Sequence, residues 1–174
     1  MDQVKSVYDE FNDNDLQSEN IQKWLQIFFR HINKFNIEEV HDFGVGQFDF
    51  YKYLNWPMSL KFKGFDNNIK ELTVAEQNCV NPKAEFILTK SFDELPGGNK
   101  NTMLVVKDVL YDWEEEEKVK FLDFVNTKYK WVLVYGHPKK TIPENYRKGL
   151  IFFQDFVEKG IWKFNNDPED TIFT

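Results

Sequence analysis

The chain has 174 residues with a formal net charge of −7, and 41% of its residues are hydrophobic and 29% are charged. This size and composition indicate one globular domain over residues 1–174 and exclude a disordered chain, and the acidic balance disfavours a long nucleic acid as the main partner. Cys79 is the only cysteine, which excludes an intrachain disulfide. The sequence shows neither a signal peptide nor an apolar run of the ~18 residues that span a membrane. We therefore expect a cytoplasmic protein without a membrane partner.

Two amphipathic helices are expected before the first strand. Apolar residues recur at helical spacing from Val4 to Phe11 and again from Ile21 to Phe35. The polar stretch between them contains Ser18, a suitable N-cap for the second helix. Residues 1–36 are therefore an N-terminal helical segment, and residues 37–174 form the core of the same domain.

Short apolar runs then alternate with helical stretches. The expected strands are Ile37–Phe43, Leu60–Asp66, Ala84–Thr89, Thr102–Lys107 and Lys130–Tyr135. The expected helices lie near Phe48–Asn55, Asn67–Asn78 and Trp113–Thr127, the last with Asp112 as its N-cap, and a short antiparallel strand at Asp170–Thr174 ends the chain. Because the connections are long enough for crossovers, the sequence predicts an α/β fold with a doubly wound, mostly parallel sheet covered by helices on both faces.

The turn after the first strand is the strongest local motif. Val40–Phe43 leads into Gly44-Val45-Gly46, and a Gly-x-Gly turn lets the backbone approach a ligand while the amides that follow are directed towards it. Asp66 ends the second strand, where doubly wound folds place an acid that binds ribose hydroxyls. The motif predicts an adenosine-containing ligand, and the structural alternative is a tight strand-to-helix connection with a capping acid.

Several other sites are disfavoured. Asp49 stands where the dinucleotide fingerprint has its third glycine, which argues against NAD or FAD, and no Gly-Lys-Ser/Thr follows to bind phosphates. His31, His41 and His137 show no zinc-ligand spacing, so no metal is expected. We interpret His41, inside a buried strand, as a core histidine.

Asp42-Phe43-Gly44-Val45-Gly46 resembles the first motif of the class I S-adenosylmethionine-dependent methyltransferases, and Gly64-Phe65-Asp66-Asn67-Asn68 resembles the second. The resemblance implies a Rossmann-like fold and S-adenosyl-L-methionine as the cofactor. It implies that Asp42 places the methionine amino group, that Phe43, Gly44 and Gly46 lie along the ligand, and that Asp66 and Asn67 hold the ribose end. Phe48 departs from the family, because many members have a third glycine there.

The stretch Lys107-Asp108-Val109-Leu110-Tyr111-Asp112-Trp113 is similar to a segment of some small members of this family. The resemblance implies that Lys107 and Asp108 lie beside the cofactor and that Phe92 borders the adenine, although Ser91 stands where the family often has an acid. The Pro-Pro motif of enzymes that methylate exocyclic base amines is absent. Methylation of exocyclic base amines is therefore not expected.

Two residues are catalytic candidates. Asp108, at the end of the fourth strand, is expected to orient the acceptor, and His137, after the fifth, is a candidate general base because its ordinary pKa lies near working pH. The structural alternatives are a strand-end cap for Asp108 and a turn residue before Pro138 for His137. Tyr111 and Trp113 either line the acceptor pocket or pack on the following helix.

The sequence thus predicts a methyltransferase whose acceptor is unidentified, with a small molecule or a protein favoured over a long nucleic acid. Lys139, Lys140, Arg147 and Lys148 form a basic patch that could meet a short nucleic acid, but we interpret it as a solvated surface. Two alternatives remain: a non-catalytic domain that binds the cofactor or regulates a partner, and an enzyme that cleaves S-adenosylmethionine.

Overall fold

Five parallel strands form the centre of the structure, a computed structural model that describes residues 25–26, 28–49, 51, 56–107, 109–110, 113–135, 150–152 and 161–165. The parallel strands are β1 (Glu39–Phe43), β2 (Lys61–Asp66), β3 (Ala84–Leu88), β4 (Thr102–Lys107) and β5 (Trp131–Tyr135). They occupy nearly the same residues as the five predicted strands. The parallel α/β sheet expected from the sequence is therefore confirmed.

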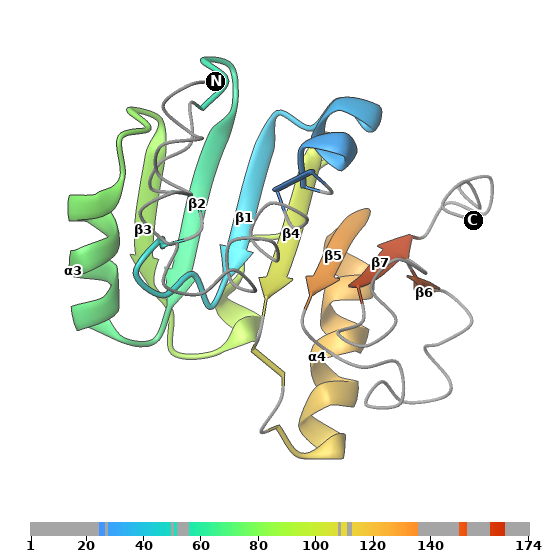
Figure 1. Cartoon of the computed structure of the whole chain (residues 1–174). Helices are drawn as coiled ribbons and strands as arrows, with labels where there is room; N and C mark the ends of the chain where they lie inside the picture. Colours follow the sequence, from blue (N-terminus) through green and yellow to red (C-terminus); the bar gives the residue numbers. More distant parts are fainter. Residues whose placement is uncertain are drawn as a thin grey trace, which may run out of the picture.

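The strand order is β3-β2-β1-β4-β5-β7-β6. From β1 the chain first adds strands on one side of the sheet and then, from β4, on the other side, so the order of the strands switches between β1 and β4. In doubly wound sheets a ligand crevice lies at this switch, outside the carboxyl ends of the strands. The carboxyl ends of β1 to β5 lie together at the lower edge of the sheet in Figure 1. This edge is where the Gly44 turn and Asp66 are located.

The last two strands have a different direction. β7 (Ile161–Asn165) pairs with β5 antiparallel, and β6 (Leu150–Phe152) pairs with β7 antiparallel. The arrow of β7 accordingly points opposite to its neighbour β5 in Figure 1. The strand expected at Asp170–Thr174 lies outside the described residues.

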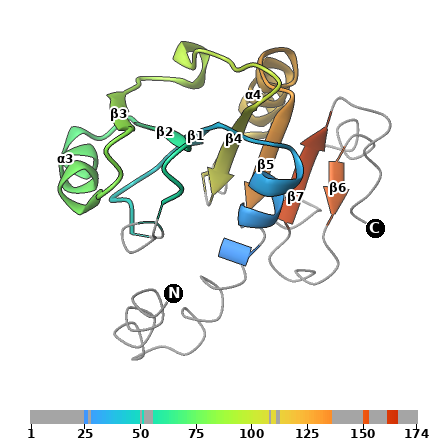
Figure 2. The same cartoon turned by 90° about the horizontal axis from the view of Figure 1, so that it is seen from above.

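Apolar side chains alternate along the strands, so that the sheet separates two cores. One core holds Val40, Phe62, Met103 and Val105 with Leu25, Phe28 and Ile32 of the N-terminal helical segment and Ala75 of α3 (Ile69–Asn78). The other holds Phe43, Phe65, Leu104 and Val106 with Phe121, Leu122 and Val125 of α4 (Glu115–Lys128). Figure 2 shows α4 and the described N-terminal helical residues, 25–26 and 28–34, on opposite sides of the sheet. Because both faces are covered, β4 and β5 are nearly continuous apolar runs.

The N-terminal helix predicted over 21–35 is present in the described residues 25–26 and 28–34, whereas the helix predicted over 4–11 lies outside them. No helix in the described part of the chain has the length and apolar run needed to cross a bilayer.

Two helix predictions need correction. The helix expected at Phe48–Asn55 does not begin at Phe48, because that residue has a φ of 66°, and the described residues 44–49 and 51 form turns. The N-cap of α4 is Glu114 and not Asp112, and no side chain caps this helix end. Its acidic first turn, Glu115–Glu117, instead favours the helix through the positive end of the helix dipole.

Candidate functional site

The turn after β1 depends on glycine for two independent reasons. Gly44 has a φ of 80°, in the left-handed region, and a Cβ at this position would lie 2.4 Å from Cγ2 of Val109 in the segment after β4. The amides of Gly44 and Val45 donate to the carbonyl of Phe65, at 2.8 and 3.1 Å. The turn is therefore fixed between the carboxyl ends of β2 and β4.

Asp66 joins this turn to the start of α3. Its Oδ2 accepts a hydrogen bond of 2.9 Å from the amide of Gly46, and its Oδ1 accepts one of 3.0 Å from the amide of Asn68, the N-cap of α3. Each carboxylate oxygen has a further lone pair, so a partly exposed carboxylate held in this way can still accept hydrogen bonds from a ligand. The geometry thus gives Asp66 a structural function, and its binding of ribose hydroxyls stays a prediction.

Asp42 is a buried carboxyl group with one satisfied oxygen. Its side chain is 2% exposed, and Oδ2 accepts a hydrogen bond of 2.7 Å from the hydroxyl of Tyr51. Oδ1 is buried without a hydrogen-bond partner among the described residues. Burial raises the pKa of Asp42 to about 7, although the Tyr51 hydrogen bond and the charge of Lys107 lower it. A buried acceptor of this kind favours a ligand that can donate to it.

Two cavities meet at Gly44. The first, here named the Asp42 cavity, has a volume of about 400 Å³ and is lined by Asp42, Gly44, Gly46, Asp49, Tyr51, Glu71 and Lys107, among others. The second, the Asp66 cavity, has a volume of about 270 Å³ and is lined by Phe43, Gly44, Asp66, Asn67, Phe92 and Trp113, among others. Together they form a site with a charged, polar part on one side of the glycine turn and a more aromatic part on the other.

The structure brings the described members of the predicted cofactor site together, since each lines one of these two cavities. They are Asp42, Phe43, Gly44, Gly46, Asp66, Asn67, Phe92 and Lys107. Asp108, His137 and Tyr111 lie outside the described residues. Trp113 contacts Phe121 of α4, with ring centroids 5.4 Å apart, as expected for packing on the following helix, and it also lines the Asp66 cavity.

Sequence reasoning missed Tyr51, Asp49 and Glu71, which line the Asp42 cavity. Glu71 could have been found, because the first turn of a helix that follows β2 must lie at the carboxyl edge of the sheet. Tyr51 carried no motif. Its position depends on the path of the chain after Gly46, which the expected helix at 48–55 described incorrectly.

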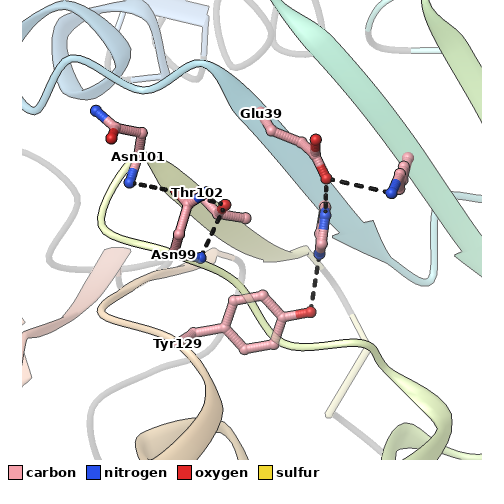
Figure 3. Close-up of polar contacts among 7 residues, drawn as sticks. Glu39, Asn99, Asn101, Thr102 and Tyr129 are labelled. Atoms are coloured by element: carbon pink, nitrogen blue, oxygen red, sulfur yellow. Dashed lines mark hydrogen bonds and ion pairs between the residues drawn. The ribbon is translucent and has the colours of Figure 1, made fainter.

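His41 belongs to a separate polar cluster, seen in part in Figure 3. Its Nδ1 lies 2.9 Å from the hydroxyl of Tyr129 and its Nε2 lies 2.5 Å from Oε1 of Glu39, which also pairs with Lys63 at 3.4 Å. Burial lowers the pKa of His41, so a neutral ring that donates from Nε2 and accepts at Nδ1 satisfies both contacts. None of these four residues lines either cavity, and the prediction of a core histidine is confirmed. Within the described residues, no three His, Cys, Asp or Glu side chains are grouped to hold a metal ion.

No protein-family model matches the sequence, and no curated protein matches it. Solved structures match the fold. Magnesium protoporphyrin IX methyltransferase from Synechocystis PCC 6803 with bound SAM has a TM-score of 0.64 and 15% identity, over 86% of this chain and 80% of that chain. The methyltransferase domain of bacterial CtHen1-C has a TM-score of 0.60 and 14% identity, over 84% of this chain and 98% of that chain.

This chain has a methyltransferase fold. The bifunctional kinase-methyltransferase WbdD also shares it, with a TM-score of 0.61 and 15% identity, over 85% of this chain and 39% of that chain. The chain spans 56% of the length of the SAH-bound structure of the Synechocystis enzyme. The Rossmann-like fold implied by the two glycine-containing motifs is therefore confirmed.

Proposed function

We propose that this chain is an S-adenosylmethionine-dependent methyltransferase that binds its cofactor across Gly44, between the Asp42 cavity and the Asp66 cavity. The observation that carries the proposal is the placement of two different carboxyl groups on either side of one glycine. Asp42 retains a buried oxygen without a partner, which suits an ammonium group, whereas the partly exposed Asp66 suits ribose hydroxyls. S-adenosylmethionine carries an ammonium group at one end and a ribose in its middle. The shared fold supports the proposal.

The Asp66 cavity suits the adenosine part of the cofactor. Phe92 and Trp113 line it with ring centroids 6.1 Å apart and an interplanar angle of 32°, which presents aromatic surface to an adenine ring. Asn67 and Phe43 line the same cavity beside Asp66. In this proposal Phe92 borders the adenine and Asp66 with Asn67 holds the ribose.

The Asp42 cavity suits the amino-acid part. Lys107, at the end of β4, lines this cavity, and its charge acts on Asp42 to lower the carboxyl pKa. A carboxylate and an ammonium group on neighbouring strands match the ammonium and carboxylate of a methionine moiety. Asp42 would thus hold the amino group and Lys107 the carboxylate.

The bound cofactor supplies a methyl group on a positively charged sulfur, and the neutral thioether that remains after transfer is a good leaving group. The chain contributes orientation and exclusion of water, effects that together can lower a barrier by ~7–11 kcal/mol without a dedicated acid or base. Asp108 directly follows Lys107 at the mouth of β4, and we assign it the orientation of the acceptor. His137, two residues after β5, is assigned as general base where the acceptor needs one.

The acceptor in this proposal is a small molecule or a protein. The net charge of −7 and the carboxylates Asp49 and Glu71 beside the Asp42 cavity disfavour a long polyanion near the methyl group. Residues 1–174 act as one domain, in which Leu25, Phe28 and Ile32 of the N-terminal segment pack in the core on one face of the sheet.

Incubation with S-adenosylmethionine labelled in its methyl group tests this function against its competitors. Label that moves to a small molecule or protein, with S-adenosylhomocysteine formed only when that acceptor is present, is the expected result. Consumption of the cofactor without any acceptor would identify a cleaving enzyme. Binding without turnover over a broad acceptor panel would identify a non-catalytic domain.

A further inference from the structure

Tyr51 is held by a set of aromatic rings. Its ring centroid lies 5.2 Å from that of Phe48, 5.5 Å from Phe28, 5.6 Å from Trp56 and 5.4 Å from Phe62, and its side chain is 2% exposed. Contacts of this kind fix a ring in one orientation. The direction of the Tyr51 hydroxyl is therefore set by packing and does not depend on the hydrogen bond that the hydroxyl makes.

Phe48 anchors the glycine turn to the same rings. It has a φ of 66°, in a region that bulky side chains rarely adopt, yet it is fully buried and stacks on Trp56 at 5.8 Å with an interplanar angle of 20°. A residue keeps such a conformation only where its surroundings over-determine it. The burial of Phe48 thus fixes the path of the chain from Gly46 to Tyr51.

The hydroxyl of Tyr51 reaches one oxygen of Asp42. It donates to Oδ2 at 2.7 Å, while Oδ1 has no partner among the described residues, and both side chains line the Asp42 cavity. A carboxylate bonded at one oxygen by a fixed donor cannot rotate freely. Its second oxygen is therefore held in place for a ligand.

We infer that Tyr51 is a positioning residue for Asp42, which it orients so that Oδ1 receives the ammonium group of the cofactor. The inference rests on the proposed function, because it concerns the amino-acid end of the same site. It assigns to an aromatic side chain from the turn region the task of presenting a carboxyl group to the ligand. Tyr51 itself need not touch the reacting methyl group.

Tyr51→Phe is a clean test, because the ring and its aromatic contacts remain while the hydroxyl is lost. Tyr129→Phe is the matched control, since it also removes a buried tyrosine hydroxyl that bonds to a side chain, that of His41, while Tyr129 lines neither cavity. Two ligands are titrated into the whole chain by calorimetry. S-adenosylhomocysteine carries the ammonium group, and methylthioadenosine carries the same nucleoside without the amino-acid end.

We expect Tyr51→Phe to weaken the binding of S-adenosylhomocysteine about tenfold, the usual scale for one hydrogen bond that acts on a charged group. The affinity for methylthioadenosine should change by less than twofold. As the pH falls, Asp42 is protonated and the affinity for S-adenosylhomocysteine is lost. This loss should begin at a higher pH in the variant, because the Tyr51 hydrogen bond lowers the pKa of Asp42. The other charged groups around Asp42 are Lys107 and Asp66, with Asp49 and Glu71 on the same cavity, and the variant leaves them in place. Tyr129→Phe should leave both affinities and the pH profile unchanged.

Equal affinity of wild type and Tyr51→Phe for S-adenosylhomocysteine would overturn the inference and leave the proposed function standing. Equal weakening of both ligands would also overturn it, since the hydroxyl would then stabilise only the turn. If the wild-type chain binds neither ligand, the proposed function fails and the inference fails with it.

Discussion

The amide of Gly46 donates a 2.9 Å hydrogen bond to Oδ2 of Asp66, which ties the glycine turn after β1 to the end of β2. The second oxygen of the same carboxylate accepts from the amide of Asn68. One side chain therefore sets the spacing of two segments that line the Asp66 cavity. This double attachment means that stability and ligand binding are coupled at position 66.

Asp66→Ala should lower the free energy of unfolding by about 1–3 kcal/mol, because two backbone donors lose their partner. It should also weaken the binding of S-adenosylhomocysteine at least tenfold. Urea denaturation and calorimetric titration measure the two effects. Asp93→Ala, which removes an exposed carboxylate in η1 (Phe92–Glu94), should change neither. Full stability of the Asp66 variant would show that these two hydrogen bonds contribute nothing.

Gly44→Ala should destabilise the fold by about 2–4 kcal/mol, because it combines a left-handed φ with overlap on Val109. Gly46→Ala should cost only about 1 kcal/mol, because a Cβ there meets no atom within 4 Å and only its φ of 58° is unfavourable. Val109→Ala should rescue part of the loss in the first variant and none in the second. A double-mutant cycle without coupling between positions 44 and 109 would contradict the packing described for the turn.

Asp42→Asn should make the fold more stable at high pH. Folding raises the pKa of Asp42 from 3.8 to about 7, because burial disfavours the ionised carboxylate. The free energy of unfolding therefore decreases as the pH rises from about 4 to 7, where this group is ionised in the unfolded chain and protonated in the native one. The decrease reaches about 4 kcal/mol above pH 7 as an upper limit, and the amide should recover part of it. Melting temperatures of the variant and the wild type should therefore coincide near pH 4, diverge as the pH rises to about 7, and keep a constant difference above pH 7.

Asp49→Asn serves as the control for Asp42→Asn, because its carboxyl group is exposed on the same cavity, and it should show no such divergence. The stabilised Asp42→Asn chain should at the same time lose affinity for S-adenosylhomocysteine. A variant that is destabilised at pH 8 would indicate that Asp42 is ionised and well solvated by its surroundings.

Asp108→Asn should separate binding from turnover. If Asp108 orients the acceptor, the affinity for S-adenosylhomocysteine should stay within a few-fold of wild type while methyl transfer falls by ~10²-fold or more. Transfer rates and calorimetry on the same preparation give both quantities. A variant that loses thermal stability and retains its transfer rate would make Asp108 a strand-end residue without a catalytic role.

Much of the sheet could be predicted from the sequence, because buried parallel strands require apolar runs such as Thr102–Lys107 and because glycines are required where the chain turns sharply after β1. The position of Tyr51 could not. A helical pattern over 48–55 predicted a regular helix, whereas burial of Phe48 among aromatic rings favours a left-handed residue and turns. Local periodicity does not contain this tertiary contribution, and for the same reason the unpaired oxygen of Asp42 appears only once the chain is folded.

The cofactor site is tested by the thermal stability of the wild-type chain with S-adenosylhomocysteine and, in parallel, with NAD and with ATP. At 100 times the dissociation constant, a ligand that binds only the folded state adds ~2.7 kcal/mol, which corresponds to roughly 5–10 °C for a domain of this size. We expect this increase with S-adenosylhomocysteine and none with NAD or ATP. An equal increase with NAD, or no increase with S-adenosylhomocysteine, would overturn the proposed cofactor.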